Sequence, residues 1–170
     1  VQGSTHKDLR ERFTAETVAM DFPGYAVGGT CVGEPKADTW EAIETVVSGL
    51  PADRPHYMMG TGTPEDLADG VMRGIDMFDC VMPSRNARNG HIFTSEGIIR
   101  IRNSQFKEDT SALDPNCDCY TCLHHSRSYL HFLFKNKLPL YMPLACIHNV
   151  RVMHKTCEVL RDVIQFQDGK

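Results

Sequence analysis

The sequence predicts an α/β protein that forms the later half of a (β/α)8 barrel. Over residues 1–83, short apolar runs alternate with segments of helical spacing, which is the pattern of a parallel sheet. The runs end in polar or glycine-rich residues, as strands do at the functional end of a barrel. A complete barrel needs eight strands and about 250 residues. Because this segment supplies about four strands, we expect half a barrel.

The first elements follow this order. Residues 1–4 resemble a strand end that runs into a loop, and residues 7–20 have the apolar spacing of a helix. Residues 24–29 form an apolar run closed by glycines, which is typical of a buried strand. A second helix is predicted over residues 39–50, with Asp38 as its N-cap.

The next two units repeat the pattern. Residues 56–60 are predicted as a strand, and residues 63–66 open a helix with the capping-box spacing and a proline at its first position. A further strand is expected over residues 77–82, where Pro83 stops it.

The alternation of strands and helices breaks after residue 83. Residues 84–113 are polar, and the alternation within residues 92–94 and 97–102 predicts a small antiparallel excursion. Two amphipathic helices are expected at the end of the chain, over residues 126–135 and 149–166.

The net charge of −4 is distributed unevenly along the chain. Residues 1–84 carry −8, residues 85–107 carry +4 and residues 108–170 carry zero. An acidic total argues against indiscriminate nucleic-acid binding. The basic segment is either an edge that contacts phosphates or a solvated face.

The sequence contains no apolar run near the about 20 residues that cross a bilayer, so no membrane partner is expected. Val1 is not a methionine, and no signal peptide follows it. We therefore expect a chain that continues upstream and a cytoplasmic location.

Seven cysteines, an odd number, argue against a fully paired disulfide framework. Three of them lie within six residues, at Cys117, Cys119 and Cys122, which predicts a metal site; reduced thiols in a loop are the alternative. A closed zinc site needs a fourth ligand. The candidates are His124, His125, Cys146 and His148.

Asp79 lies in the apolar strand expected over residues 77–82, between Phe78 and Cys80. A carboxylate there is costly unless it is paired or functional. Asp79 is therefore either a catalytic group or an end-of-strand residue bound to neighbouring backbone. The sequence has no G-x-G-x-x-G, P-loop or G-x-S-x-G motif, so the corresponding nucleotide-binding and serine-hydrolase fingerprints are absent.

Three strings together resemble the tRNA-guanine transglycosylase family. They are Gly-Thr-Gly-Thr-Pro-Glu-Asp at 60–66, Gly-Ile-Asp-Met-Phe-Asp-Cys-Val at 74–81 and Arg-Asn-Ala-Arg-Asn-Gly at 85–90. The cysteine cluster with the distant pair His148-Asn149 is similar to the same family. The resemblance covers essentially the whole chain and implies the C-terminal half of a zinc-bearing (β/α)8 catalytic domain.

The resemblance implies an enzyme that exchanges the wobble guanine of tRNA for a 7-deazaguanine. Asp79 would be the nucleophile that attacks the ribose C1′, which gives a covalent tRNA–enzyme intermediate that the incoming base resolves. The wobble nucleotide must leave its stack to reach the pocket.

The resemblance also implies which residues bind the substrates. The purine base would be contacted by Gln2, Gly29 and Met59. The residues implied in RNA contacts are Gly60, Thr61, Gly62, Thr63, Pro64, Glu65, Asp66, Ser84, Arg85, Asn86, Ala87 and Arg88.

One structural zinc ion per chain is implied, with the ligands Cys117, Cys119, Cys122 and His148. The implied division places four βα units in residues 1–83, and an RNA-contacting and zinc-binding insertion in residues 84–124. Terminal helices in residues 125–170 would pack on the zinc site and the barrel. The implied partners are tRNA and the 7-deazaguanine base, and full-length members commonly form homodimers.

Two features depart from the family pattern. The general acid/base aspartate and a further base-binding aspartate of the family lie upstream of Val1, so we expect this chain alone to be inactive. Bacterial members usually have Leu-Ala-Val after the paired glycines, whereas this chain has Thr30, Cys31 and Val32. Val32 favours the smaller prequeuine base over queuine, and Thr30 can alter the contact with its aminomethyl group.

Two other functions fit parts of the pattern. A non-catalytic, zinc-stabilised tRNA-binding subunit would share the cysteine cluster, but such partners usually lose the nucleophile, which is intact at Asp79. A relative that acts at another tRNA position would carry a C-terminal RNA-binding appendage, and we expect none after Lys170.

Overall fold

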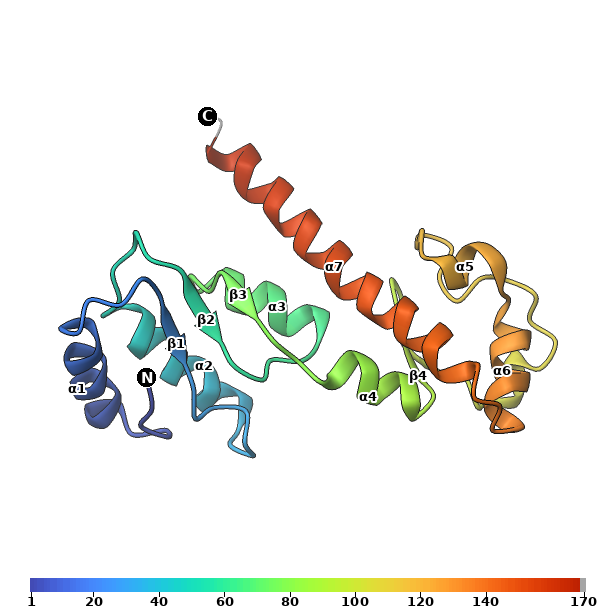
Figure 1. Ribbon diagram of the computed structural model, residues 1–170, viewed down its shortest axis with the longest axis horizontal. Helices are drawn as coiled ribbons and strands as arrows, with labels where there is room; N and C mark the ends of the chain where they lie inside the picture. The colour runs from blue at the N-terminus through green and yellow to red at the C-terminus, as the bar shows by residue number, and fades with distance from the viewer. Residues whose placement is uncertain (169–170) are drawn as a thin grey trace. The chain divides into compact units, whose positions relative to one another are not determined.

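The computed structural model describes residues 1–168 and divides into two compact units, Val1–Cys80 and Val81–Lys170 (Figure 1). The last two residues of the terminal segment predicted over 125–170 lie outside the described residues. Within the described part, none of the helices is both long and apolar enough to span a membrane.

The first unit is a three-stranded parallel sheet whose strands alternate with helices, as the sequence predicts. The strand order is β1-β2-β3, with Ala26 opposite Tyr57 and Met58 opposite Phe78. Its elements are α1 (Lys7–Val18), β1 (Tyr25–Val27), α2 (Lys36–Val47), β2 (His56–Met58), α3 (Pro64–Val71) and β3 (Met77–Phe78).

The start of the chain lies beside β1. The Gly28 N–H donates to the Val1 carbonyl at 2.9 Å, and the Val1 amino group donates to the Ala26 carbonyl. The expected first strand over residues 1–4 is thus reduced to backbone pairing at Val1, and Gln2 follows directly at the end of the sheet.

The core of the first unit lies between the sheet and the helices that follow its strands. Its fully buried members include Val27, Ile43, Val46 and Met58. The helix predicted over residues 7–20 is confirmed as α1, but it buries Arg10 and Thr14 while the apolar Leu9 and Phe13 are exposed. Three backbone carbonyls accept from Nε and Nη2 of Arg10, which offsets part of the cost of burying its charge, whereas Nη1 has no hydrogen-bond partner among the described residues.

Two predicted helix starts in this unit have opposite outcomes. The capping box that opens α3 is confirmed: the Thr63 hydroxyl accepts from the Asp66 N–H, and the Asp66 carboxylate accepts from the Thr63 N–H. The prediction of Asp38 as a cap is wrong, because α2 begins two residues earlier, at Lys36, after an N-cap position held by Pro35.

The second unit is built around the long helix α7 (Tyr141–Asp168), which contacts the other main elements of the unit (Figure 1). The predicted antiparallel excursion is confirmed as a hairpin of β4 and β5, with Ile92 opposite Ile99. The other elements are α4 (Met82–Arg88), β4 (His91–Thr94), β5 (Gly97–Arg100), a 3-10 turn η1 (Ser104–Phe106), α5 (Tyr120–His124) and α6 (Arg127–Lys135).

Further elements differ from the prediction. The strand expected over residues 77–82 ends at Phe78, and Met82 begins α4, in which Pro83 occupies the first turn. Proline is tolerated there because the first N–H groups of a helix have no intrahelical acceptor. The last helix begins at Tyr141 and not at residue 149, and α5 was not predicted.

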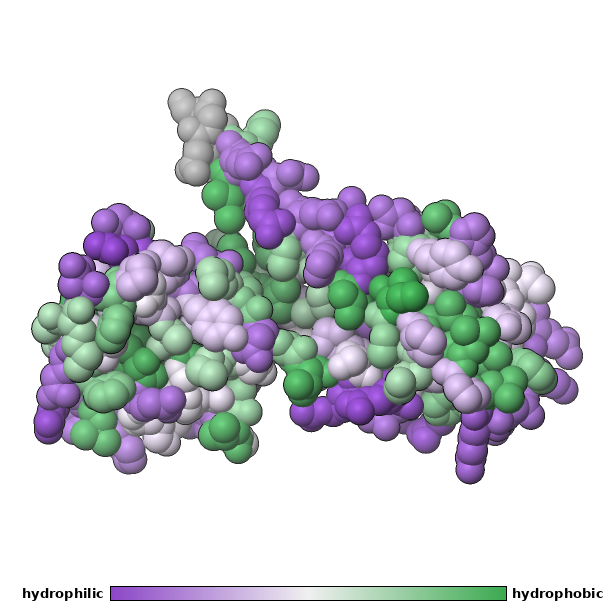
Figure 2. Space-filling view, in the orientation of Figure 1, coloured by the Kyte–Doolittle hydropathy of each residue, from purple (hydrophilic) through white to green (hydrophobic). Residues whose placement is uncertain are grey.

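The core of the second unit joins α4, the hairpin, α6 and the start of α7. Its buried members include Ala87, Ile92, Ile101, Phe106, Leu130, Leu133, Tyr141 and Leu144. Both units also keep large hydrophobic side chains at the surface, and Figure 2 shows hydrophobic patches on each of them.

Candidate functional site

Asp79 lies one residue beyond β3, at the carboxyl end of the parallel sheet. Its carboxylate accepts a hydrogen bond from the Tyr57 hydroxyl at 2.5 Å and from the Gly60 N–H at 3.1 Å. Tyr57 lies in β2, and Gly60 lies two residues after the end of that strand. Because β2 and β3 are parallel neighbours, their carboxyl ends lie at the same edge of the sheet. The two hydrogen bonds fix the orientation of the carboxylate. Because Asp79 is exposed, the carboxylate is also accessible.

These hydrogen bonds determine the charge of the site. The Tyr57 hydroxyl and then the Gly60 N–H lower the pKa of Asp79, because both stabilise the carboxylate form. The same interaction raises the pKa of Tyr57. At neutral pH the site therefore presents an anionic oxygen beside a neutral phenol.

Replacing Tyr57 with Phe removes the principal donor to Asp79. Because the donor stabilises the ionised form, Tyr57→Phe should raise the pKa of Asp79 toward the ordinary aspartate value. An NMR titration of the side-chain carboxyl carbons should move the Asp79 midpoint to higher pH. The midpoint of Asp66, which Lys36 and Thr63 bind, should not move; an unmoved Asp79 midpoint contradicts the role of Tyr57.

A glycine turn follows β1 and is held by a buried arginine. The Arg10 side chain donates to the Gly28 and Gly29 carbonyls, each at 3.2 Å, and to the Ser4 carbonyl at 2.5 Å. Gly29 has φ 66°, a left-handed conformation that favours glycine. The buried role of Arg10 was not predicted from the sequence. The one available signal was a charged residue within the apolar spacing of residues 7–20.

The three residues predicted to contact a purine gather at this turn. A Cβ atom at Gly28 would lie 2.7 Å from the Gln2 amide nitrogen and 3.3 Å from the Met59 sulfur. Gln2 likewise lies where a Cβ atom of Gly29 would be. Because Gly28 and Gly29 have no side chains, Gln2 can lie against both of them and Met59 against Gly28.

Glu34 organises the loop after the glycine turn. Its carboxylate accepts from the N–H groups of Cys31 and Val32 and from the Thr39 hydroxyl at 2.6 Å. Although burial opposes the charged form, these donors lower the pKa of Glu34 to about 2. Cys31 has a left-handed φ of 61°, so the loop is held in a restrained conformation.

The segment 60–66 begins at a hydrogen-bond partner of Asp79 and ends in the capped start of α3. Thr61 is buried in this chain, whereas Glu65 is exposed. Lys36 binds the carboxylate of Asp66 at 2.6 Å, which fixes the end of the segment. The predicted RNA-contacting segment is thus ordered and connected directly to Asp79.

The segment 84–88 forms most of α4 in the second unit. Arg85 and Arg88 are exposed, and neither makes an ion pair within residues 1–168. Ala87 is fully buried, and its carbonyl accepts from the Tyr141 hydroxyl at 2.9 Å. The helix therefore presents its arginines to solvent while Ala87 anchors it to the core.

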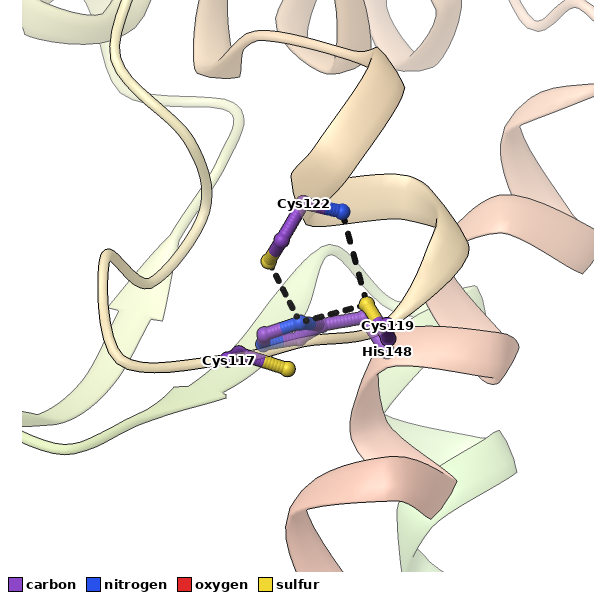
Figure 3. Close-up of side chains that lie close together, drawn as sticks. All are labelled: Cys117, Cys119, Cys122 and His148. Atoms are coloured by element: carbon purple, nitrogen blue, oxygen red, sulfur yellow. Dashed lines mark hydrogen bonds between the residues drawn. The ribbon is translucent and has the colours of Figure 1, made fainter.

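A second cluster joins three cysteines and a histidine in the second unit (Figure 3). The three thiol sulfurs and one ring nitrogen all lie within 4.8 Å of one another. His148 Nδ1 is 3.2 Å from the Cys122 sulfur and 3.5 Å from the Cys119 sulfur. The cluster consists of Cys117, Cys119, Cys122 and His148, and three thiols with one imidazole are a common donor set for structural zinc.

The surroundings of His148 direct one nitrogen toward the sulfurs. Its Nε2 lies 2.7 Å from the Phe93 carbonyl, which can only accept, so Nε2 carries the proton and Nδ1 is free to bind a metal. The adjacent Asn149 donates to the carbonyls of Pro83 and His91 and accepts from the Phe93 N–H. The His148-Asn149 pair is therefore held by buried hydrogen bonds to β4 and to the start of α4.

Hydrogen bonding between the cysteine thiols shifts their pKa values in opposite directions. A hydrogen bond from the Cys122 thiol stabilises the Cys119 thiolate and, although burial opposes the charged form, holds the pKa of Cys119 below its ordinary value. The same pairing raises the pKa of Cys122. One thiolate is thus favoured at neutral pH, which suits a cation site.

The other candidates for a fourth ligand lie elsewhere. The rings of His124 and His125 contact Tyr120, with centroid distances of 4.6 and 5.7 Å. The Cys146 thiol points to the Ser84 carbonyl at 4.0 Å. His148 is therefore the residue that completes the four-residue cluster.

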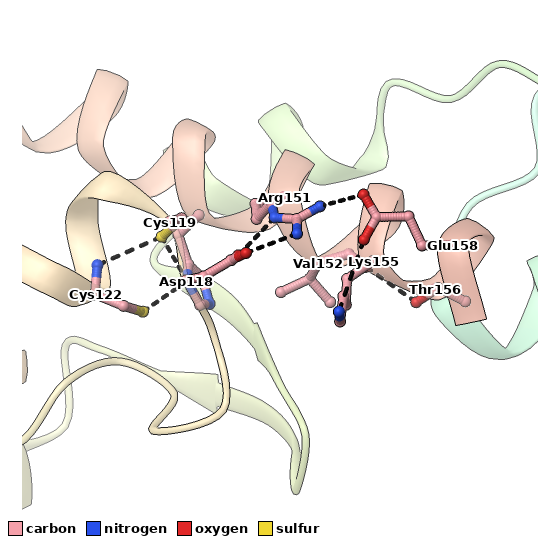
Figure 4. A network of polar contacts seen from close by, with 9 residues as sticks. Asp118, Cys119, Cys122, Arg151, Val152, Lys155, Thr156 and Glu158 are labelled. Carbon is pink, nitrogen blue, oxygen red and sulfur yellow. Dashed lines mark hydrogen bonds and ion pairs between the residues drawn. The ribbon is translucent and has the colours of Figure 1, made fainter. Parts of the chain in front are cut away.

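An ion-pair network holds the cysteine loop to α7 (Figure 4). Arg151 binds both carboxylate oxygens of Asp118, at 2.6 and 2.8 Å, and also Glu158 at 2.7 Å. Asp118 lies between two cluster cysteines, and Arg151 follows His148 by three residues, which is about one helical turn. The network therefore connects the two segments that supply the cluster.

Comparisons with known proteins place the whole described chain in one family. The model of the family described as "Queuine tRNA-ribosyltransferase" matches residues 1–168. Proteins of that name from Shewanella sp. (strain ANA-3) and Aeromonas hydrophila are 54% and 53% identical over 165 residues, which is 97% of this chain. The chain spans 44% of the length of each of these relatives.

Proposed function

Because this chain belongs to the queuine tRNA-ribosyltransferase family, we propose that it supplies the nucleophile of a tRNA-guanine transglycosylase. That enzyme exchanges the wobble guanine of tRNA for a 7-deazaguanine. The observation that carries the proposal is Asp79, an accessible carboxylate held in its anionic form at the end of a parallel sheet. The activity is proposed for a protein of the relatives' full length that contains this chain.

The proposed chemistry proceeds by two displacements at the ribose C1′. An Asp79 oxygen forms a bond to C1′ while the C1′–N9 bond breaks, and guanine leaves with the bonding electrons and takes up a proton. The N9 atom of the incoming base then loses its proton, bonds to C1′ and releases the carboxylate. Each step has an oxocarbenium-like sugar, as in retaining glycosidases. Tyr57 and Gly60 orient the carboxylate throughout.

We assign base recognition to Gln2, Gly29 and Met59. Support comes from their proximity at Gly28 and from the fixed carbonyls that Arg10 binds. The 7-deazaguanine is proposed to be the prequeuine base, because Val32 leaves less room than the smaller residue of queuine-using members. RNA would be contacted by residues 60–66 and by residues 84–88, where the exposed arginines provide positive charge.

The three-stranded sheet is proposed to be part of a (β/α)8 barrel, with four βα units over residues 1–83. Residues 84–124 would be the RNA-contacting and zinc-binding insertion, and residues 125–170 the terminal helices. A homodimer in the cytoplasm is the assembly and location that we propose for the full-length protein.

The metal is proposed to be one structural Zn²⁺, bound by Cys117, Cys119, Cys122 and His148. Thiolate and imidazole ligands suit zinc, and four protein ligands leave no open position for water. The ion would join the cysteine loop to α7 and would take no part in the displacement at Asp79.

The Arg151–Asp118 ion pair should slow the release of this zinc. Outer-shell partners commonly change metal affinity about 10- to 100-fold, so Arg151→Met should release zinc to a chromogenic chelator about tenfold faster. Lys155→Met is the matched control, because within the described residues Lys155 makes an ion pair with Glu158 alone, at 3.8 Å, and none with Asp118. Equal release rates for the two variants would show that the pair does not hold the cysteine loop.

The proposed function is tested by trapping the intermediate. The full-length protein, tRNA and a base analogue should give a protein–RNA band on a denaturing gel, and Asp79→Asn should give none. A band that persists unchanged in Asp79→Asn would refute the assignment of Asp79. The absence of a band for the unmodified protein, with tRNA binding retained, would instead indicate the non-catalytic subunit.

A further inference from the structure

Arg10 is a buried charge that the proposed displacement at the ribose does not use. Its side chain belongs to α1 and is fully buried, and Nη1 has no hydrogen-bond partner among the described residues. A buried charge is costly unless its donors find acceptors. Buried charges can often be replaced by apolar side chains of similar volume without loss of stability. The stability of the fold therefore does not by itself account for an arginine at this position.

The guanidinium of Arg10 joins two loops of the first unit. Nη2 donates to the carbonyls of Gly28 and Gly29, each at 3.2 Å, and Nε donates to the Ser4 carbonyl at 2.5 Å. The two glycines directly follow β1, and Ser4 lies two residues after Gln2. One side chain thus connects the two loops that carry Gln2 and Gly29, which are both assigned above to base recognition.

Both loops have backbone conformations that require restraint. Gly3 and Gly29 have φ angles of 142° and 66°, and Ser4 has a φ of 51° although it carries a side chain. Such a conformation is costly for residues other than glycine and persists where the surrounding structure holds it. A Cβ atom at Gly3 would lie 2.8 Å from Cγ of Arg10, so the stem of the arginine also packs against this loop. Arg10 therefore restrains the segment that follows Gln2.

The bond from Arg10 to the Gly28 carbonyl also determines the direction of a neighbouring N–H group. A trans peptide is planar, and its C=O and N–H bonds point in opposite directions. The peptide between Gly28 and Gly29 is trans, so the Gly29 N–H points away from the guanidinium. Among the described residues this N–H has no hydrogen-bond acceptor. Because the Gly29 carbonyl is bound as well, the turn is fixed on both sides of the residue.

The Gln2 side chain lies beside this oriented N–H group. Its amide nitrogen would lie 2.7 Å from a Cβ atom at Gly28, and its amide oxygen would overlap a Cβ atom at Gly29. Guanine and 7-deazaguanine share a carbonyl oxygen on the six-membered ring, and a carbonyl oxygen accepts hydrogen bonds from N–H donors. The backbone N–H and the amide of Gln2 are donors of that kind.

We infer that Arg10 is a positioning residue for base recognition, which orients the Gly29 N–H and the Gln2 amide toward the carbonyl oxygen of the purine base. Arg10 acts through the backbone of the two loops and does not contact the base itself. This inference rests on the proposed function, because that function supplies the base.

The inference is tested by Arg10→Lys in the full-length protein, measured as exchange of labelled guanine into tRNA. Lysine keeps the charge but has a single nitrogen, so it cannot reproduce the fork that binds three carbonyls. Loss of one hydrogen bond to the base should raise the KM for guanine about tenfold, while kcat changes less than about threefold. Such a split indicates lost binding of the base and not a lost chemical step. Arg10→Met, which removes every donor, should raise the KM further.

Thr14→Val controls for a general loosening of α1. Thr14 is buried on the same helix, and its hydroxyl donates to the Arg10 carbonyl at 2.7 Å, so valine should lower Tm and leave the KM for guanine unchanged. An unchanged KM in Arg10→Lys would overturn the inference, as would an equal rise in Thr14→Val. The absence of exchange by the unmodified protein would instead refute the proposed function, and the inference with it.

Hydrogen–deuterium exchange of the unmodified full-length protein is a second test, which needs no variant to fold. Guanine, added at a concentration that saturates the exchange rate, should slow deuterium uptake in peptides that contain residue 29. Peptides from α6 should take up deuterium equally with and without guanine. Equal uptake at residue 29 under both conditions would overturn the inference.

Discussion

Asp79→Asn should lower kcat/KM for base exchange by about 10⁴-fold or more, with little change in the affinity for tRNA. Removal of a catalytic nucleophile typically lowers the rate constant about 10⁴- to 10⁶-fold. The amide keeps nearly the same shape, so the hydrogen bond from Gly60 can remain, but it cannot form the ester to C1′. The rate is measured as incorporation of labelled guanine into tRNA by the full-length protein.

The control for this variant is Asp53→Asn. Asp53 is a carboxylate of the same unit with a side chain that is 82% exposed, and among the described residues its one ion pair is to Arg54, at 3.9 Å. Its variant should exchange guanine at the unmodified rate. An Asp79→Asn rate within tenfold of this control would mean that another group attacks the ribose.

Cys119→Ser should remove the metal and destabilise the second unit. Cys119 is buried, caps α5 through its sulfur and is close to both Cys122 and His148. A structural zinc contributes its binding free energy to folding, so loss of one ligand should cost several kcal/mol. For a chain of this size, each kcal/mol shifts Tm by about 2–4 °C, and we expect a decrease of about 10 °C or more.

Zinc content and melting of Cys119→Ser should be compared with those of Cys157→Ser. Cys157 lies on the same long helix as His148, nine residues later and outside the cluster. Its variant should keep one zinc ion per chain and the unmodified Tm. A full zinc content in Cys119→Ser would contradict the proposed ligand set.

The parts of the fold that follow from local chemistry could be predicted from the sequence. The capping box of Thr63 and Asp66 is complete within four residues, and the three cysteines lie within six. His148 could not be selected from spacing alone, because it reaches the cysteines only through the packing of α7 and the hydrogen bond to Phe93. The resemblance to a family was needed to prefer it over its neighbours.

The errors arose where tertiary contacts override a local signal. Pro83 marks a strand end in many sequences, but here it lies in the first turn of α4, where its missing N–H has no cost. Arg10 interrupts a helical apolar pattern and is nevertheless buried, where backbone carbonyls of the glycine turn accept from its Nη2 group while Nη1 has no hydrogen-bond partner among the described residues. Such carbonyls cannot be identified before the fold is known.

The most direct test of the central claim is to locate the covalent bond between protein and RNA. The full-length protein is trapped with tRNA, digested with nuclease and protease, and its peptides are sequenced by mass spectrometry. The account predicts a single ribose adduct on the carboxylate of Asp79, with none on Tyr57 or Asp76. A ribose adduct on any other residue, with Asp79 unmodified, would contradict it.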